Sequence, residues 1–235
     1  MTADFSLSYQ RMSQTFFITG TDTGVGKTVL TVLLARHLRR RGIAVAALKP
    51  VASGGRDDAR ALRAALENSL TLDEINPWHF RTPLAPLLAA RRERRQVRRA
   101  GVLAHVRTMQ KRFGVVLVEG AGGLLSPLGE DFNSRDLIAA LHPATIIVGP
   151  NRIGVVNHVW LTLEALPRAA AARTRVVLMS PRRPDPATGT NAGLLAEFFD
   201  AEKILEMPWL GERWRTDRAL ADSRVQRTLQ ALIEG

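Results

Sequence analysis

The sequence predicts an α/β fold of three layers, a mostly parallel central sheet with helices on both faces. Short apolar runs rich in Val and Ile recur along the chain, and longer stretches with helical spacing of apolar residues separate them. Strands that are apolar on both sides suit a sheet covered on both faces, and the intervening helices suit parallel connections. The length of 235 residues fits one large domain, which we expect at 15–235, after a disordered or frayed extension at 1–14.

The predicted elements follow one another in a regular order. Strands are expected at 16–19, 43–48, 115–118, 145–148 and 176–179, with a weaker strand at 204–205. Leu, Val and Ala residues at helical spacing predict a helix at 29–41. A loop rich in Pro, Arg and Asp is expected at 181–190, beyond a strand end, where open α/β sheets place their ligands.

Composition narrows the function classes. The chain has no cysteine, which excludes disulfides and thiolate metal sites and is typical of a reduced cytoplasm. No apolar run is long enough to span a membrane, so we expect no membrane partner. The net charge of +11 comes mainly from arginine, which is densest at 91–99 without interleaved aromatic residues. We interpret this run as a solvated helix face or connector and predict no nucleic-acid partner.

The strongest motif is a glycine-rich loop at 20–28, Gly-Thr-Asp-Thr-Gly-Val-Gly-Lys-Thr, between a predicted strand and a predicted helix. Such a loop turns successive N–H groups toward phosphate oxygens, and the helix N-terminus adds positive potential. Lys27 would reach the β- and γ-phosphates, and the Thr28 hydroxyl would bind Mg²⁺. The loop is a variant, because Thr21 stands where the strict pattern has glycine. We predict a fold of the P-loop NTPase type that binds a nucleoside triphosphate; the alternative is a glycine turn with a surface lysine.

Charged side chains also follow the second and third predicted strands. Lys49 ends the second strand, where a long cation can point into the crevice, and a lysine snorkelling at a strand end is the alternative. Glu119 ends the third strand and can bind Mg²⁺, while the glycines that begin with Gly120 let the backbone approach a phosphate. Between these two segments, Asp57 and Asp58 form an acidic pair at the start of a predicted helix, where helix capping by one or both is the alternative to a role in the site.

Together these segments resemble dethiobiotin synthetases, the ATP-dependent ring-closing enzymes of biotin synthesis. The resemblance spans 16–210 and is specific, because the segments occur in the family's order. Besides the phosphate loop, the matching segments are Lys49-Pro50-Val51-Ala52-Ser53-Gly54, Asn76-Pro77-Trp78 with Phe80 and Pro83, Val118-Glu119-Gly120-Ala121-Gly122-Gly123, Gly154-Val155-Val156-Asn157-His158 and Met207-Pro208-Trp209-Leu210.

The resemblance implies a reaction of 7,8-diaminopelargonate with CO2 or bicarbonate and ATP. One amine takes up CO2 as a carbamate, whose oxygen attacks the γ-phosphate to give a carbamic-phosphoric anhydride. The second amine then closes the ureido ring of dethiobiotin. Cations must gather these anions, so Lys49 and Lys27 are the expected catalytic residues. Mg²⁺ is the expected cofactor, held by Thr28, Asp58 and Glu119, with Asp58 preferred over Asp57 on the family's spacing.

The same resemblance assigns the binding residues. The nucleotide is expected at Gly24, Val25, Gly26, Lys27, Thr28, Val29, Asp58, Glu119, Gly120, Ala121, Gly122, Ser180, Met207, Pro208 and Trp209. The substrate is expected at Thr23, Ser53, Gly154, Val155, Val156 and Asn157. In the family, the last four open a helix of the partner subunit whose N–H groups bind the substrate's carboxylate, which implies a homodimer. A plain N-cap at Gly154 is the alternative.

Two positions depart from the family pattern. Leu87 stands where many members have His, and the other departure concerns the nucleobase. Members carry an Asn after the fifth strand that reads the adenine, and here Met179-Ser180-Pro181 stands instead. Neither a Met nor a Ser side chain offers an amide's paired donor and acceptor, so the nucleobase preference stays open.

Two other functions remain as alternatives. A cobyrinate amide synthetase-like enzyme would carry a glutaminase domain with a catalytic Cys, and this chain has no Cys. A partition or septum-site ATPase, which works as a dimerising switch, would carry an extra Lys near the start of the phosphate loop, where Thr21, Asp22 and Thr23 stand.

Overall fold

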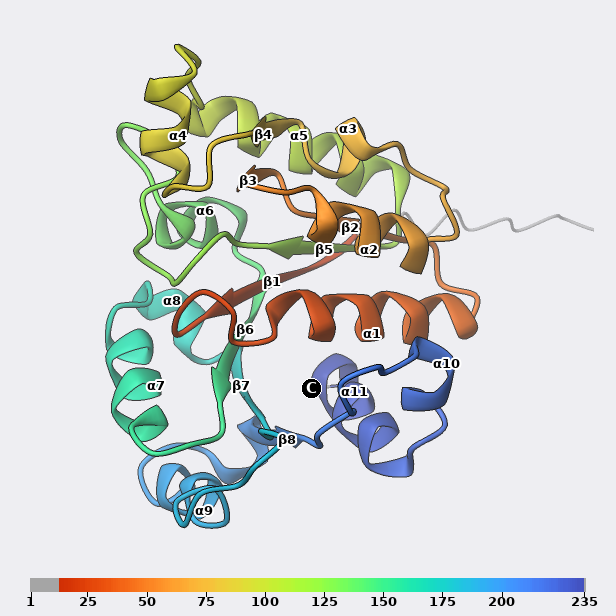
Figure 1. Ribbon diagram of the computed structural model, residues 1–235, viewed down its shortest axis with the longest axis vertical. Coiled ribbons are helices and arrows are strands. Elements are labelled where there is room, and N and C mark those ends of the chain that lie inside the picture. Colours follow the sequence, from red (N-terminus) through yellow and green to blue (C-terminus); the bar gives the residue numbers. More distant parts are fainter. Residues whose placement is uncertain (1–12, 235) are drawn as a thin grey trace, which may run out of the picture.

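The computed structural model describes residues 13–234 and has the three layers that the sequence predicts (Figure 1). Six strands form the main sheet in the order β2-β5-β1-β6-β7-β8, and every neighbouring pair is parallel. In chain order these strands are β1 (Gln14–Gly20), β2 (Val45–Leu48), β5 (Val115–Glu119), β6 (Ala144–Pro150), β7 (Thr174–Met179) and β8 (Ile204–Met207). All six overlap the predicted strands.

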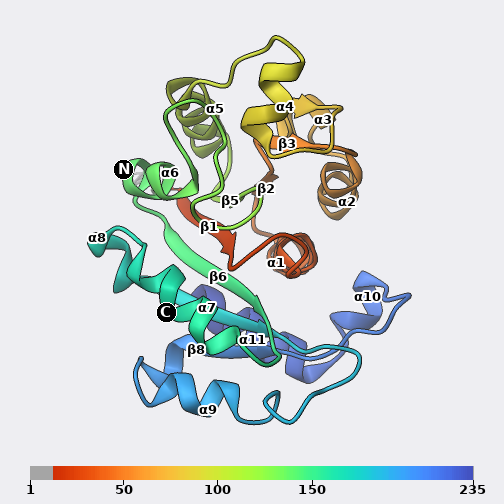
Figure 2. The ribbon, with the colours of Figure 1, turned by 60° about the vertical axis from the view of Figure 1, so that its left-hand side comes forward.

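Helices cover both faces of this sheet (Figures 1 and 2). One face carries α1 (Lys27–Arg40), α2 (Asp57–Ala65), α10 (Thr216–Ala219) and α11 (Ser223–Glu234). The other face carries α5 (Arg99–Arg112), α6 (Ser134–Leu141), α7 (Val155–Glu164) and α8 (Arg168–Ala171). Next to β8 lie α9 (Asn191–Ala196) and the 3₁₀ turn η1 (Ala201–Lys203).

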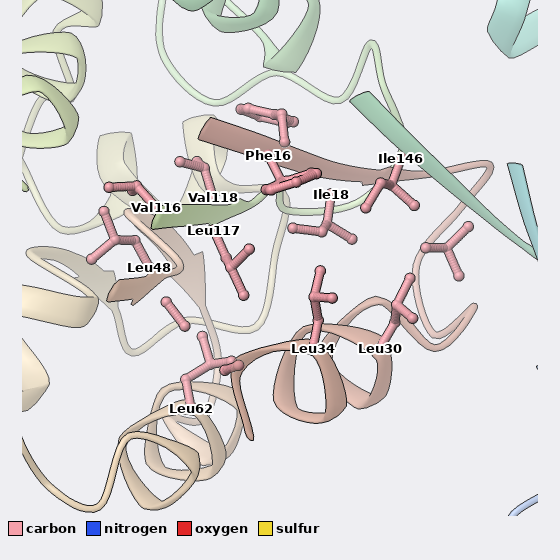
Figure 3. Close-up of a cluster of buried hydrophobic side chains, with 14 of the residues drawn as sticks. Phe16, Ile18, Leu30, Leu34, Leu48, Leu62, Val116, Leu117, Val118 and Ile146 are labelled. Atoms are coloured by element: carbon pink, nitrogen blue, oxygen red, sulfur yellow. The ribbon is translucent and has the colours of Figure 1, made fainter. Parts of the chain in front are cut away.

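The helix α1 shows why the sequence folds in this way. Its Leu residues recur three and four positions apart, which places them on one stripe of the helix. Leu30 and Leu34 of that stripe are fully buried and point toward the sheet, where Ile18 of β1 and Leu117 of β5 are also fully buried (Figure 3). This packing holds α1 against the middle of the sheet and so fixes the loop that connects β1 to it.

A smaller unit lies at the β2 edge of the sheet. It contains the parallel pair β3 (Val51–Ser53) and β4 (Trp78–Phe80), with α3 (Leu72–Ile75) and α4 (Pro86–Arg92) beside them. The backbone N–H of Lys49 donates to the carbonyl of Ile75 at 2.9 Å, and the buried Asn76 side chain donates to the Lys49 carbonyl at 2.8 Å. The end of β2 is therefore fixed by contacts from this unit.

The strand order places a ligand crevice beside β1. The chain proceeds from β1 to β2 and β5 on one side and crosses later to β6 on the other, so the order reverses at β1. Open α/β sheets bind ligands at such a point, outside the carboxyl ends of the strands. The glycine-rich loop follows β1 and lies at this place.

Two further expectations concern the N-terminal extension and membrane-spanning helices. The predicted extension at 1–14 falls mostly outside the described residues, and Gln14 already belongs to β1. Within residues 13–234, no helix combines the length and the apolar character that crossing a membrane requires.

Candidate active site

The glycine-rich loop has the backbone that an anion-binding loop needs. Gly24 and Gly26 have φ angles of 73° and 101°, values at which a side chain is strained, so glycine is required at both positions. Gly26 is the N-cap of α1 and no side chain caps this helix end. The first N–H groups of α1 therefore remain without side-chain partners at the mouth of the loop, as in phosphate-binding helix N-termini.

Lys27 begins α1 and folds back over this loop. Its Nζ donates to the Asp22 carbonyl at 2.7 Å, and the residue is only 6% exposed. The pKa of Lys27 is lowered from its ordinary value of 10.5 to about 8, mainly because the residue is buried. The nearby Lys49 ammonium contributes to this fall, and the charges of Glu119, Asp58 and Asp22 oppose it. The ammonium is thus poorly solvated in the protein alone, and a bound phosphate would supply the anionic partner that the burial removes.

Four charged or polar side chains from four elements converge at the sheet edge. Lys49 follows β2, Asp58 is in the first turn of α2, Glu119 ends β5 and Thr28 is in the first turn of α1. The Lys49 ammonium forms ion pairs with the Asp58 carboxylate and with Glu119 Oε1, the latter at 2.9 Å. The Thr28 hydroxyl donates to the same Glu119 Oε1 at 2.6 Å. The three residues predicted to hold a metal are therefore brought together around Lys49.

The electrostatics of this cluster follow from burial. The Glu119 side chain is fully buried and its Oε2 atom has no hydrogen-bond partner. Lys49 is nearly as buried, and desolvation alone would lower its pKa, but the charges of Glu119 and Asp58 and its hydrogen bonds to both raise it. Lys49 is consequently held in its charged form.

These side chains line one cavity of about 760 Å³. Of the residues predicted to bind nucleotide, metal or substrate, the cavity is lined by Thr23, Gly24, Gly26, Lys27, Thr28, Val29, Lys49, Ser53, Asp58, Glu119, Ala121 and Gly122. The volume is within the range of small-molecule sites in proteins.

The two aspartates at the start of α2 differ in position and in ion-pair partner. Asp58 borders the cavity and pairs with Lys49. Asp57 forms an ion pair with Arg60 at 2.8 Å, and its side chain is 90% exposed. Neither is the N-cap, which is Arg56. The geometry therefore supports Asp58 over Asp57 as a cavity carboxylate.

Several predicted residues do not border this cavity. Val25 and Gly120 are buried and do not face the cavity. The Gly120 N–H donates to the Ile18 carbonyl at 2.9 Å, which fixes the start of its loop against β1. Gly154 is the N-cap of α7 with a φ of 89°, and no side chain caps that helix. The substrate residues that follow it, Val155, Val156 and Asn157, lie in the first turn of α7, away from the cavity of the same chain.

The residues predicted to contact the nucleobase lie at the ends of β7 and β8. Met207 is fully buried, and its carbonyl accepts a hydrogen bond from the Ser180 N–H at 2.9 Å, so in this structure it holds Ser180 in place. Trp209 is 47% exposed, and Pro208 lies beside it. The Met179 side chain lies against Gly26, which places the end of β7 next to the phosphate loop.

The sequence reasoning missed one wall of the cavity. Pro83, Leu84, Ala85 and Pro86 form it together with Ala52, and the Ser53 hydroxyl donates to the Leu84 carbonyl. Ser126 and Pro127 complete the lining, and the Ser126 hydroxyl accepts from the Gly123 N–H at 2.9 Å. The sequence shows the prolines at 83 and 86, but it gives no signal that this segment lines the same cavity as Lys49 and the phosphate loop.

Solved structures show the same fold at low identity. A ParA family ATPase from Chlorobium tepidum TLS matches with a TM-score of 0.59 at 11% identity, over 94% of this chain and 99% of that one. The pNOB8 ParA structure, bound to nonspecific DNA, matches with a TM-score of 0.56 at 14% identity, over 94% of this chain and 97% of that one. At such identities the likeness supports the P-loop NTPase type of fold and nothing finer.

Sequence comparison is more specific. A family model described as an AAA domain matches residues 14–213. The ATP-dependent dethiobiotin synthetase BioD of Anaeromyxobacter dehalogenans (strain 2CP-1) is 40% identical over 209 residues, covering 87% of this chain and 94% of that protein. The protein of the same name from Akkermansia muciniphila is 38% identical, over 84% and 90% of the two chains. That from Bacillus velezensis is 32% identical, over 94% of each. With this cavity and these relatives, the chain belongs to the family of ATP-dependent dethiobiotin synthetases.

Proposed function

We propose that the chain uses ATP and Mg²⁺ to convert 7,8-diaminopelargonate and CO2 into dethiobiotin, ADP and phosphate. One amine adds to CO2 and loses a proton to give a carbamate. A carbamate oxygen attacks the γ-phosphorus and ADP leaves, which yields a carbamic-phosphoric anhydride. The second amine attacks the carbonyl carbon and phosphate leaves, closing the ring. The observation that carries this proposal is the convergence of Lys27 and Lys49 on one cavity that also borders the phosphate loop.

The two lysines address the main obstacle to this chemistry. A carbamate and a triphosphate are both anions, so cations must lie between them for the oxygen to reach phosphorus. Lys27 lies over the phosphate loop, and Lys49, which pairs with Asp58 and Glu119, lines the same cavity. We assign Lys27 to the β- and γ-phosphates and Lys49 to the phosphoryl group during transfer. The substrate supplies the nucleophile, so no side chain has to form a covalent intermediate.

The residues present fit a magnesium ion. Thr28, Asp58 and Glu119 offer hard oxygen donors, and the buried Glu119 Oε2 atom lacks any partner. Among residues 13–234 no three His, Cys, Asp or Glu side chains gather, which suits an ion that keeps waters and phosphate oxygens as further ligands. When bound with ATP, Mg²⁺ would neutralise charge on the β- and γ-phosphates.

The wall at 83–86 suits the rest of the substrate. Pro83, Leu84 and Pro86 give this side of the cavity an apolar surface, which an aliphatic chain can contact without desolvating polar groups. The hydrogen bond from Ser53 to Leu84 fixes the serine at the boundary between this wall and the charged cluster. We assign Ser53 to the carbamate or the neighbouring amine.

We also propose that the active form is a homodimer, in which the start of α7 from a second copy binds the substrate's carboxylate. Gly154 caps α7 without a side chain, so the N–H groups of the first turn have no side-chain cap. Three large apolar side chains near this helix are exposed: Ile153 at 77%, Leu161 at 60% and Leu125 at 54%. Leu125 and Leu161 line one groove of about 430 Å³. Such an apolar surface favours burial against another copy.

The arginine run at 91–99 has internal partners, which supports the proposal that it binds no nucleic acid. Arg91 forms an ion pair with Glu130. The Arg95 guanidinium lies 4.8 Å from the centre of the Phe80 ring and donates to the His79 carbonyl at 2.6 Å. These contacts give part of the run a structural role at the edge of the sheet.

The proposal is tested by incubating the purified chain with the diamine, bicarbonate and MgATP and measuring dethiobiotin and phosphate together. We expect equimolar products from the native chain. Lys49→Ala should lower turnover by ~10²- to 10³-fold, the usual cost of losing one transition-state contact, and should leave nucleotide binding largely intact. Lys111→Ala, which removes an exposed lysine of α5, is the matched control. Phosphate release without dethiobiotin from the native chain, or near-normal turnover of Lys49→Ala, would contradict the assignment.

A further inference from the structure

The two carboxylates assigned to the metal already hold a cation of the protein itself. The Lys49 ammonium is ion-paired with Asp58 and lies 2.9 Å from Glu119 Oε1. Glu119 Oε1 also accepts the Thr28 hydroxyl at 2.6 Å. The Lys49 side chain is only 10% exposed and that of Glu119 is fully buried, so water contributes little to the balance of charge there. All three residues assigned to the metal thus contact Lys49 or share an acceptor atom with it.

Lys49 and Mg²⁺ cannot both keep these contacts. Mg²⁺ binds oxygen at about 2.0–2.1 Å in a nearly octahedral arrangement and tolerates little distortion. An ammonium bonded to the same carboxylate oxygens would lie within roughly 4 Å of the ion, where the repulsion between cations is strong in a poorly solvated site. Two donors of the set, Asp58 and Glu119 Oε1, would therefore have to exchange one cation for the other.

We propose that Lys49 serves as a built-in counter-cation, which occupies the metal position in the protein alone and is displaced by Mg²⁺ arriving with the nucleotide. This inference rests on the proposed function for the identity of the metal and the nucleotide. In it, Lys49 and the metal compete for Asp58 and Glu119. The arrival of the metal complex is therefore the event that frees the Lys49 ammonium for the phosphoryl group.

The charges of the cluster support this exchange. Lys27, Lys49, Asp58 and Glu119 together carry two positive and two negative formal charges, which balance in the protein alone. If a metal took over the two carboxylates, the Lys49 ammonium would become available to the triphosphate beside that of Lys27, which already lies over the phosphate loop. The flexible four-carbon stem of lysine allows its head group to move several ångström without backbone change. Lys49 lines the cavity that Ser53 and Lys27 also line, so its displaced head group stays at the site.

The first test measures Mg²⁺ alone, without nucleotide, by calorimetric titration. We expect weak binding to the native chain and binding at least ~10-fold tighter to Lys49→Met, because the variant lacks the competing cation. Lys111→Met removes an exposed lysine and should bind Mg²⁺ as the native chain does. Equal affinity of the native chain and Lys49→Met would overturn the proposal, because the ammonium would then not compete for the carboxylates.

The second test follows Lys49 in the native chain, so it remains decisive if Lys49→Met does not fold. The chain contains only four lysines, so a sample labelled with nitrogen-15 at lysine Nζ gives a simple NMR spectrum. We expect the Lys49 signal to shift on addition of Mg²⁺ with a non-hydrolysable ATP analogue, and to shift far less with the analogue alone. An unchanged Lys49 signal at saturation would overturn the proposal. Neither test needs turnover, so a chain that makes no dethiobiotin would refute the proposed function while leaving this exchange measurable.

Discussion

The burial of Lys27 predicts that this residue destabilises the protein when no nucleotide is bound. Lys27 is 6% exposed, and its burial lowers its pKa from 10.5 to about 8. We consider Lys27→Met, which keeps most of the side-chain volume and removes the charge. The variant should be more stable than the native chain in the absence of nucleotide, and it should lose most of its affinity for ATP.

The magnitude follows from the pKa difference. A fall from 10.5 to about 8 corresponds to about 3 kcal/mol, at 1.36 kcal/mol for each pKa unit. The variant also loses the 2.7 Å hydrogen bond from Lys27 to the Asp22 carbonyl, worth about 1 kcal/mol. We therefore expect the free energy of unfolding at pH 7 to be about 2 kcal/mol higher for Lys27→Met than for the native chain.

The pH dependence has a definite sign. Below pH 8 both folded and unfolded chains carry the Lys27 proton, so the full cost is present. Between about 8 and 10.5 the unfolded chain binds more protons than the folded one, so the stability of the native chain rises with pH relative to the variant. The advantage of Lys27→Met should accordingly shrink by up to ~1.4 kcal/mol per pH unit in that window.

Urea denaturation at several values between pH 7 and 10 measures this difference. Lys111→Met, an exposed lysine on α5, is the control and should match the native chain throughout. A Lys27→Met variant that is no more stable at pH 7, or a gap that does not narrow as the pH rises, would refute the reasoning. In either case Lys27 would be solvated well enough to carry its charge without cost.

Three further predictions concern the same cavity. Glu119→Gln and Asp58→Asn should each weaken binding of the magnesium–nucleotide complex more than binding of nucleotide alone, because an amide keeps the shape and removes a hard anionic ligand; calorimetric titrations with and without Mg²⁺ measure this, and equal losses would speak against metal ligation. Gly26→Ala should lower stability by about 1–2 kcal/mol and impair nucleotide binding, because Gly26 has a φ of 101° and an added Cβ would lie 3.1 Å from Met179. Thermal melting measures the stability of Gly26→Ala. Gly193→Ala, where an added Cβ meets nothing within 4 Å, is the matched control in that experiment. Discrimination among ATP, CTP, GTP and UTP should be about tenfold or less in kcat/KM, since Ser180 offers a single hydroxyl in place of an amide; a thousandfold ATP preference would point to another reader of the base.

The main sheet could be predicted because its strands are buried on both faces. Runs such as 115–118 are apolar at every position, and such runs between helical stretches are typical of the buried strands of a parallel sheet. The pair β3 and β4 gave no comparable signal. Each has three residues, and the pairing of Val51 with Trp78 and of Ser53 with Phe80 depends on a segment more than twenty residues away in the chain. No local periodicity indicates a contact of that kind.

The sequence was sufficient to predict which residues of the candidate site lie close together, but not how they contact one another. Lys49 and Glu119 follow strands that are both parallel to β1, so their positions at strand ends imply that they share an edge of the sheet. What the sequence could not show was their direct ion pair, or the burial that leaves one Glu119 oxygen without a partner. Both depend on side-chain packing from α1, β2, α2 and β5 together. The burial of Met207 could not be predicted for the same reason, because the motif indicates proximity and not exposure.

The loop at 181–190 is joined to the body of the protein by a chain of buried amides. Asn191, at the end of this loop, donates to the Asn151 side chain, which in turn donates to Glu206 of β8, each at 2.9 Å. Asp185 in the loop accepts the Ile153 N–H at 2.7 Å, just before α7. Asn191 is only 4% exposed, so this anchor is shielded from water.

This anchoring has a practical meaning for redesign. Replacing this loop with one from another member of the family would remove its hydrogen bonds to Asn151 and to the turn before α7. These bonds are kept only if the partner residues are transferred together with the loop. The transplantable unit is therefore the loop together with Asn151, Ile153 and Glu206, and a graft of the loop alone should yield a protein whose α7 end is unsupported.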